Sequence, residues 1–285
     1  MKVITRAEID LNSVEHLIDL ALDEDIKHGD LTTENIISGE KKISAIIKAK
    51  AEGIISGLFV AEIVFKKLDN NIAWNQKYED GDIVKNGDIL VEFSGSHRAI
   101  LMGERTALNF LQRMSGVATK TNAFVHAVKG TNAQILDTRK TLPAYRMLDK
   151  YSVTMGGGKN HRIGLFDIVM IKDNHIRVAE GISNAVNKIR AVVDKKIKIE
   201  VETSNITEVE EAINCKVDII MLDNMSNNEM KKAVDFIAGR ALVEASGNVN
   251  LERVKSIAET GVDFISIGAL THSVFALDIG QYILD

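Results

Sequence analysis

The stretch IKIEVETSNITEVEEAINCKVDIIMLD, residues 197–223, holds two short apolar runs separated by a segment of helical length. The runs cover 197–202 and 217–223, and each ends in an acidic residue. Four more runs of this kind lie after residue 112, at 134–138, 167–172, 242–246 and 264–268. The six runs end 34, 30, 21, 23 and 22 residues apart, a spacing typical of successive strand and helix units in a parallel sheet.

Six units are fewer than the eight of a closed barrel, so this repeat favours an incomplete α/β barrel or an open, doubly wound sheet. The pattern before residue 112 is different. Residues 42–51 and 89–94 resemble strands of a mostly antiparallel sheet, and helices at 14–22 and 59–68 are expected to cover one of its faces. We therefore expect an N-terminal domain over 1–112 and a barrel domain over 113–285, with a C-terminal helix that packs back on the N-terminal domain.

The composition excludes several classes of protein. Of 285 residues, 45% are hydrophobic and 26% are charged, values typical of ordinary globular chains. The net charge of -5 gives no basic excess for a phosphate backbone, so we expect no nucleic-acid partner. An apolar stretch of bilayer length is absent, and we expect no membrane contact and a cytoplasmic location. The single cysteine, Cys215, excludes an internal disulfide and a thiolate metal cluster.

Each predicted strand of the second domain ends in polar or glycine residues. In barrels and open α/β sheets, ligands bind beyond the carboxyl ends of the strands, so these groups should converge on one mouth. Polar loops alone would not explain why basic residues follow the early strands and acidic residues the middle ones. We therefore expect an active site that includes the residues at these ends: Thr138, Arg139, Lys140, Lys172, Glu202, Asp223, Ser246, Gly247, Asn248, Gly268 and Ala269.

Two acidic residues can be placed at this mouth. Alternation along 197–202 puts Glu200 and Glu202 on one face of the strand, with Glu202 nearest the mouth. Together with Asp223, Glu202 forms a carboxylate pair that suits a Mg²⁺ ion retaining most of its waters, or the hydroxyls of a sugar ring. No cluster of histidine and cysteine indicates zinc.

The basic candidates indicate an anionic ligand. So many cations at one mouth would repel each other unless a ligand with several negative charges offset them, and both carboxylates and phosphates suit arginine and lysine. A glycine-rich segment, 155–160, lacks the spacing of a phosphate loop, and we interpret it as a flexible loop that delivers two of these residues. The candidates are Arg105, Arg139, Lys140, His161, Arg162 and Lys172.

The last two strand ends suit a phosphate. Residues 246–248 read Ser-Gly-Asn and residues 268–269 read Gly-Ala, and such small residues let backbone N–H groups at helix starts approach an anion. Many barrels bind phosphate after their late strands. The two segments together therefore predict a phosphate site.

Several long segments closely resemble quinolinate phosphoribosyltransferases. They are GERTALNFLQRMSGVAT (103–119), DTRKTLPAYRMLDKYSVTMGGGKNHRIGLFDIVMIKDNH (137–175), EVET (200–203), MLDN (221–224), EASGN (244–248) and GVDFISIGALTHS (261–273). The resemblance implies an N-terminal α/β sandwich-like domain, an incomplete α/β barrel and a homodimer. It also implies the reaction, in which quinolinate and phosphoribosyl pyrophosphate give nicotinate mononucleotide, pyrophosphate and CO₂ in NAD biosynthesis.

The resemblance implies a role for each candidate. One set of candidates resembles the family residues that hold the two quinolinate carboxylates: Arg105 of the partner subunit, Arg139, His161, Arg162 and Lys172. A second set, Lys140, Glu202 and Asp223, resembles the catalytic groups around the ribose, pyrophosphate and Mg²⁺. A third set resembles the 5′-phosphate cradle: Ser246, Gly247, Asn248, Ile267, Gly268 and Ala269. Asn248 stands where some members have a second glycine.

Three alternatives stay open at this point. The first is a related phosphoribosyltransferase-like protein with another anionic substrate, against which the complete basic set argues. The second is a barrel aldolase that forms a Schiff base at Lys172 or Lys159, a reaction that needs a desolvated lysine. The third is a silent barrel that binds phosphorylated ligands, which would have no reason to keep Glu202 and Asp223.

Overall fold

The computed structural model describes residues 1–37 and 39–284. The chain forms two compact units, each assembled from separate stretches of sequence. The unit that we call the parallel unit consists of Met1–Val3, Ala123–Thr141 and Gly158–His272. The antiparallel unit consists of Ile4–Asn122, Leu142–Gly157 and the chain from Ser273 onward. The predicted domain boundary at residue 112 lies inside one continuous helix, α4 (His97–Ala127), and it stays a prediction.

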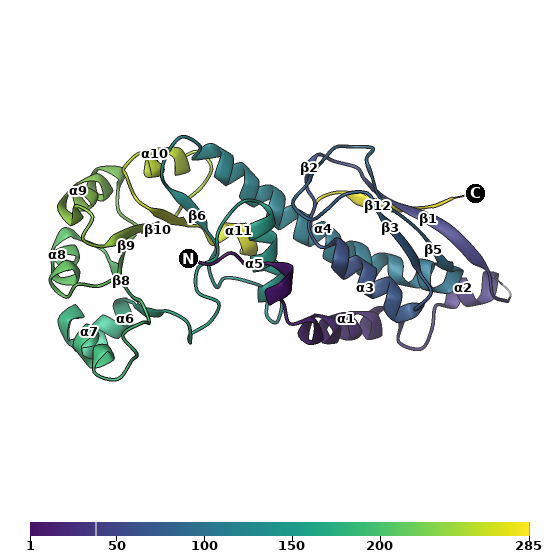
Figure 1. Ribbon diagram of the computed structural model, residues 1–285, viewed down its shortest axis with the longest axis horizontal. Helices are drawn as coiled ribbons and strands as arrows, with labels where there is room; N and C mark the ends of the chain where they lie inside the picture. The colour runs from purple at the N-terminus through teal and green to yellow at the C-terminus, as the bar shows by residue number, and fades with distance from the viewer. Residues whose placement is uncertain (38, 285) are drawn as a thin grey trace. The chain divides into compact units, whose positions relative to one another are not determined.

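Six parallel strands form the sheet of the parallel unit, in the order β6-β11-β10-β9-β8-β7 (Figure 1). They coincide with or overlap the six apolar runs of the sequence, so the predicted parallel sheet is confirmed. The strands are β6 (Gln134–Leu136), β7 (Val169–Ile171), β8 (Ile199–Thr203), β9 (Ile219–Asp223), β10 (Leu242–Ser246) and β11 (Phe264–Ser266).

The order of these strands distinguishes the two architectures that the sequence left open. Strands β7 to β11 follow one another in chain order across the sheet, and β6, the first strand, pairs with β11, the last. This cyclic order is that of a barrel, whereas a doubly wound sheet reverses its order near the middle. Within residues 1–37 and 39–284, β6 and β7 share no ladder, so the barrel is open between them. The prediction of an incomplete barrel is confirmed.

Helices connect the strands on the outer side of this sheet (Figure 1). Asn205 and Ser226 begin two of them, because their side chains accept backbone N–H groups of the first turn. The apolar side of α8 (Ile206–Asn214) packs inward through Val209 and Ala212. The connecting helices are α6 (Asp173–Ala179), α7 (Ile182–Arg190), α8, α9 (Asn227–Ile237) and α10 (Val254–Ala258). The short helix α11 (Ala269–His272) follows β11, the last strand of the sheet.

The antiparallel unit contains the predicted antiparallel sheet. Four strands pair in the order β12-β1-β5-β3, and two short strands, β2 (Gly53–Ile54) and β4 (Ile83–Val84), form a separate ladder. The N-terminal sheet domain expected from the sequence is therefore confirmed. The four main strands are β1 (Lys42–Ala49), β3 (Ala73–Gln76), β5 (Ile89–Ser96) and β12 (Ile279–Leu284).

The helices of the antiparallel unit include both of those predicted near the start of the chain. Helix α3 buries Phe59, Val64 and Phe65, and Phe65 packs against Phe93 of β5 with the ring centroids 4.7 Å apart. No helix in the described part of the chain has the length and apolar character needed to span a membrane. The helices are η1 (Arg6–Glu8), α1 (Leu11–Ile26), α2 (Leu31–Ile36), α3 (Leu58–Leu68), α4 and α5 (Arg146–Met155).

The prediction of a C-terminal helix is wrong, because residues 279–284 form the strand β12. This segment pairs with β1 along its length, from Ala49 opposite Ile279 to Ser44 opposite Leu284. Side chains of α4 secure it further, since Gln112 donates a hydrogen bond to the carbonyl oxygen of Ile279 at 2.7 Å. Residues 279–284 are extended because they supply backbone hydrogen-bond partners to the edge of β1.

Candidate active site

A cavity of about 780 Å³ lies at the carboxyl ends of the barrel strands. Its walls contain every candidate site residue from the sequence except Arg105. Thr138, Arg139 and Lys140 follow β6, and Glu202, Asp223 and Ser246 end the next strands of the sheet. The remaining lining candidates are His161, Arg162, Lys172, Gly247, Asn248, Ile267, Gly268 and Ala269.

Four cations face this cavity from three segments of the chain. Arg162 is 93% buried, and its Nη1 donates to the carbonyl oxygen of Ile168 at 3.4 Å. Burial and the like charge of Arg139 lower the pKa of Arg162. Lys140 is held through its backbone, because its carbonyl oxygen accepts a 2.8 Å hydrogen bond from the Thr271 hydroxyl. Four cations that line one cavity favour an anionic ligand.

Two carboxylates, from neighbouring strands, share the same cavity. Glu202 of β8 makes an ion pair with Lys172 at 2.5 Å, and Asp223 at the end of β9 accepts a hydrogen bond from the Asn224 side chain at 2.7 Å. Two carboxylates that each offer one oxygen are suited to Mg²⁺, which keeps several waters and binds substrate phosphates at its other positions. The donor set therefore fits the predicted metal.

The segment 246–248 forms a tight turn rather than a helix start. Gly247 has a φ of 93°, and a Cβ there would lie 2.2 Å from Oδ1 of Asn224. Asn248 also has a positive φ, and its side chain donates to that same Oδ1 at 3.1 Å. The next helix, α10, begins only at Val254, so the expected helix start after β10 is wrong. Glycine is required here because only it fits both the backbone and the space.

The segment 268–269 does begin a helix, the short α11. A Cβ at Gly268 would lie 2.9 Å from Cδ of Lys140, so this glycine leaves room for the lysine to pass. The backbone N–H of Ile267 donates to the carbonyl oxygen of Leu136, which joins the segment to β6. The late strand end and the basic residues after β6 are therefore neighbours.

The glycine-rich segment 155–160 is attached to β6. The N–H of Lys159 donates to Ile135, and the N–H of Asp137 donates back to Lys159. The side chain of Asn160, in turn, donates to the buried carboxylate of Asp137 at 2.7 Å. These contacts explain how the segment brings the next residue, His161, to the cavity.

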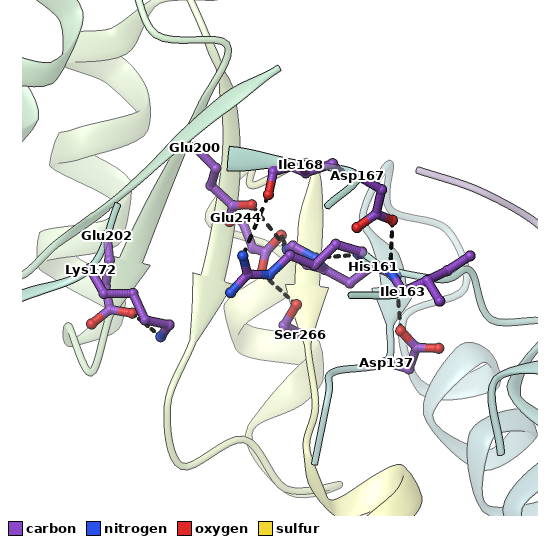
Figure 2. A network of polar contacts seen from close by, with 11 residues as sticks. Asp137, His161, Ile163, Asp167, Ile168, Lys172, Glu200, Glu202, Glu244 and Ser266 are labelled. Carbon is purple, nitrogen blue, oxygen red and sulfur yellow. Dashed lines mark hydrogen bonds and ion pairs between the residues drawn. The ribbon is translucent and has the colours of Figure 1, made fainter. Parts of the chain in front are cut away.

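His161 meets two buried acids that the sequence analysis did not propose as site residues. Its Nε2 lies 3.0 Å from Glu200 of β8 and 3.4 Å from Glu244 of β10, and both carboxylates are fully buried (Figure 2). The hydroxyl of Ser266 donates to Glu244 at 2.5 Å. Burial lowers the pKa of His161, but its contacts with Glu200 and Glu244 outweigh burial and raise it. Burial and the charge of Glu244 raise the pKa of Glu200 to about 7.

A simple signal identifies these missed residues. Each lies two positions before a residue at the mouth, as Glu200 does before Glu202, Glu244 before Ser246, and Ser266 before Gly268. Alternation puts such pairs on the same face of a strand, so these residues form the layer of side chains beneath the mouth. Other lining residues absent from the sequence prediction are Met170, Met221, Asn224, Val249 and His272.

Arg105 is the one candidate outside the cavity lining. It lies on α4, in the antiparallel unit, and its side chain is exposed.

Family models and relatives agree across nearly the whole chain. Residues 30–115 match the N-terminal domain of quinolinate phosphoribosyl transferase, and residues 117–281 match its C-terminal domain. The chain is 45% identical over 282 residues to quinolinate phosphoribosyltransferase (decarboxylating) 1b of Nicotiana tabacum, with 92% of this chain and 80% of the relative covered. It is 42% identical over 258 residues to a probable nicotinate-nucleotide pyrophosphorylase (carboxylating) of Bacillus subtilis, with 90% and 89% covered.

A solved structure extends the agreement to three dimensions. The nicotinate-nucleotide pyrophosphorylase of Francisella tularensis superposes with a TM-score of 0.95 at 39% identity and covers 100% of this chain and 99% of its own. The sequence resemblance, the two-unit fold and the lining of the cavity thus agree. The chain belongs to the quinolinate phosphoribosyltransferase family.

Proposed function

We propose that this protein transfers the phosphoribosyl group of phosphoribosyl pyrophosphate to the ring nitrogen of quinolinate, with decarboxylation. The products are nicotinate mononucleotide, pyrophosphate and CO₂. The observation that carries the proposal is one cavity that holds Arg139, Arg162 and Lys172 together with Glu202 and Asp223. Family membership supports the choice of substrates.

The transfer step breaks the bond between the anomeric carbon and pyrophosphate, and positive charge develops on the ribose. Glu202 and Asp223 stabilise that charge, in the way that carboxylates do in glycoside chemistry. Lys140 neutralises the departing pyrophosphate. Arg139 and Arg162 hold the pyridine so that its nitrogen attacks in line.

Decarboxylation follows on the same ring. The bond to the 2-carboxylate breaks, CO₂ leaves, and the electron pair stays on the ring carbon beside the positively charged nitrogen until a proton is taken up. Glu202 and Asp223 would hold Mg²⁺, directly or through water, and the ion would supply positive charge to the pyrophosphate. Positioning and charge are what this chain supplies.

We further propose a homodimer in which Arg105 of each subunit completes the cavity of the other. Its exposed position on α4 and the family resemblance support this arrangement. Leu165 and Phe166, which follow Arg162 closely in the chain, are 74% and 78% exposed, and apolar exposure of this kind is typical of contact surfaces. The cytoplasmic location stays a prediction that cell fractionation would test.

An observation of the cavity disfavours the aldolase alternative. A Schiff-base lysine needs a neutral amine in a desolvated site, whereas Lys172 makes an ion pair with Glu202. Lys159 does not line the cavity. A related enzyme with another anionic substrate is the alternative that the assay below must exclude.

The test is release of CO₂ from quinolinate in the presence of phosphoribosyl pyrophosphate and Mg²⁺. We expect one CO₂ and one nicotinate mononucleotide per turnover, and no release when either substrate is omitted. The variant Lys140→Ala serves as the inactive control. Failure of the folded wild-type protein to release CO₂ would exclude the proposed reaction.

A further inference from the structure

The strongest unassigned feature is the set of buried side chains beneath the cavity, formed by His161, Glu200 and Glu244 (Figure 2). None of the proposed chemical steps uses the two glutamates. They extend from strands β8 and β10 toward one nitrogen of His161, Nε2, at 3.0 and 3.4 Å. His161 and Glu244 also contribute to the cavity lining, so the set reaches the site from below.

The other polar atoms of His161 are also engaged. Its Nδ1 accepts the backbone N–H of Arg162 at 2.6 Å, and its own backbone N–H donates to Asp137 at 2.9 Å. Because Nδ1 accepts the N–H of Arg162, the neutral ring carries its proton on Nε2. The imidazolium, which Glu200 and Glu244 favour, also carries a proton on Nε2. Nε2 therefore lies against Glu200 and Glu244 in either charge state, whereas Nδ1 accepts the N–H of Arg162 only in the neutral ring.

Through these contacts the orientation of the imidazole determines that of the next residue. In the neutral ring, the Nδ1 contact fixes the peptide N–H of Arg162, whose guanidinium reaches into the cavity. Arg139 repels that guanidinium, while Glu200 and Asp167 attract it. Both buried acids thus act on Arg162 through the ring that contacts its backbone, and Glu200 also opposes the charge of Arg139.

We propose that Glu200 and Glu244 are positioning residues that determine the preference for a ligand with two carboxylates, because they hold His161 through Nε2 and thereby fix where Arg162 meets the ligand. This inference rests on the proposed function. Glu200 does not line the cavity, so it acts without touching the substrate. If the inference is correct, the preference for a ligand with two carboxylates depends on a hydrogen-bond acceptor for Nε2–H at position 200.

An electrostatic role and a positioning role for these acids predict opposite changes in quinolinate binding when the acid is removed. If Glu200 were only a negative charge near an anion site, its removal would strengthen quinolinate binding by relieving repulsion. If it positions His161, its removal allows the ring and Arg162 to shift, and a shift of about 1 Å can cost up to about a hundredfold in rate. The direction of the change in KM therefore separates the two.

The experiment compares Glu200→Leu, which removes the acceptor, with Glu200→Gln, which keeps an oxygen for Nε2–H. For Glu200→Leu we expect KM for quinolinate to rise about tenfold, KM for phosphoribosyl pyrophosphate to stay within about twofold, and the preference for quinolinate over nicotinate to fall. Glu200→Gln should restore KM to within about threefold of wild type. Glu244→Leu and Glu244→Gln repeat the comparison should Glu200→Leu fail to fold.

A matched control lies on the opposite face of the same strand. Thr203→Val removes the buried hydrogen bond from Thr203 to Met221 and should lower thermal stability while leaving both KM values and the preference unchanged. A lower KM in the leucine variants, or an unchanged preference for quinolinate, would overturn the inference. If the wild-type protein did not turn over quinolinate at all, the proposed function would fail instead.

Discussion

At the scale of single residues, the cationic lining predicts strong discrimination between quinolinate and nicotinate. Nicotinate lacks the 2-carboxylate and would leave a buried cation such as Arg162 without its partner. Removing one partner of such a charge pair costs about 2–5 kcal/mol, so kcat/KM for nicotinate should be lower by about a hundredfold or more. Steady-state kinetics with both acids measures this ratio. Comparable turnover of the two would contradict the assignment of the basic residues.

The two carboxylates at the ends of β8 and β9 should act mainly on turnover. Their charge is needed most when positive charge develops on the ribose, so Glu202→Gln and Asp223→Asn should each lower kcat by about tenfold or more, with a smaller effect on quinolinate affinity. Turnover and equilibrium titration are measured separately. The exposed Glu210→Gln on α8 is the control. Wild-type kcat in both variants would make the carboxylates structural.

At the scale of elements, the turn after β10 predicts a local cost of substituting Gly247. Gly247→Ala places a Cβ against Asn224 in a left-handed backbone, which should cost about 1–3 kcal/mol of stability and raise KM for phosphoribosyl pyrophosphate severalfold. Gly239→Ala is the matched control, since Gly239 also has a positive φ but no atom near its Cβ. The midpoint temperature of thermal unfolding should fall in both variants. A changed KM in the Gly239 variant as well would show that strain alone affects the site.

The elements also show how far the sequence could predict this protein. The six parallel strands were predictable because each is a short apolar run that ends at a polar mouth, and nearly all mouth residues followed from that rule. Glu200 and Glu244 were not proposed, because a buried acid within a strand signals function only when its partner, His161 from a distant segment, is known. The strand β12 was missed because its conformation depends on the edge of β1, more than two hundred residues earlier.

At the scale of the whole molecule, the proposed homodimer predicts complementation between two inactive variants. When Arg105→Ala and Lys140→Ala subunits exchange at random, about half of the dimers are mixed, and each mixed dimer has one site with both residues intact. Activity should therefore recover to about a quarter of wild type per total sites. Exchange is verified with subunits that carry distinguishable tags. If exchange occurs without recovery, Arg105 acts within its own subunit or serves only the fold.

The pairing of β1 with β12 also bears on how the protein is made. A growing chain emerges from the ribosome at about 5–20 residues per second, so β1 waits on the order of ten seconds or more for the partner that covers its edge. During that interval β1 presents unpaired backbone groups, which favour aggregation between nascent chains. Lys42 and Lys48, near the two ends of this strand, are the kind of residue that discourages such pairing. Slow synthesis or loss of these lysines should therefore reduce the yield of soluble protein without altering the finished enzyme.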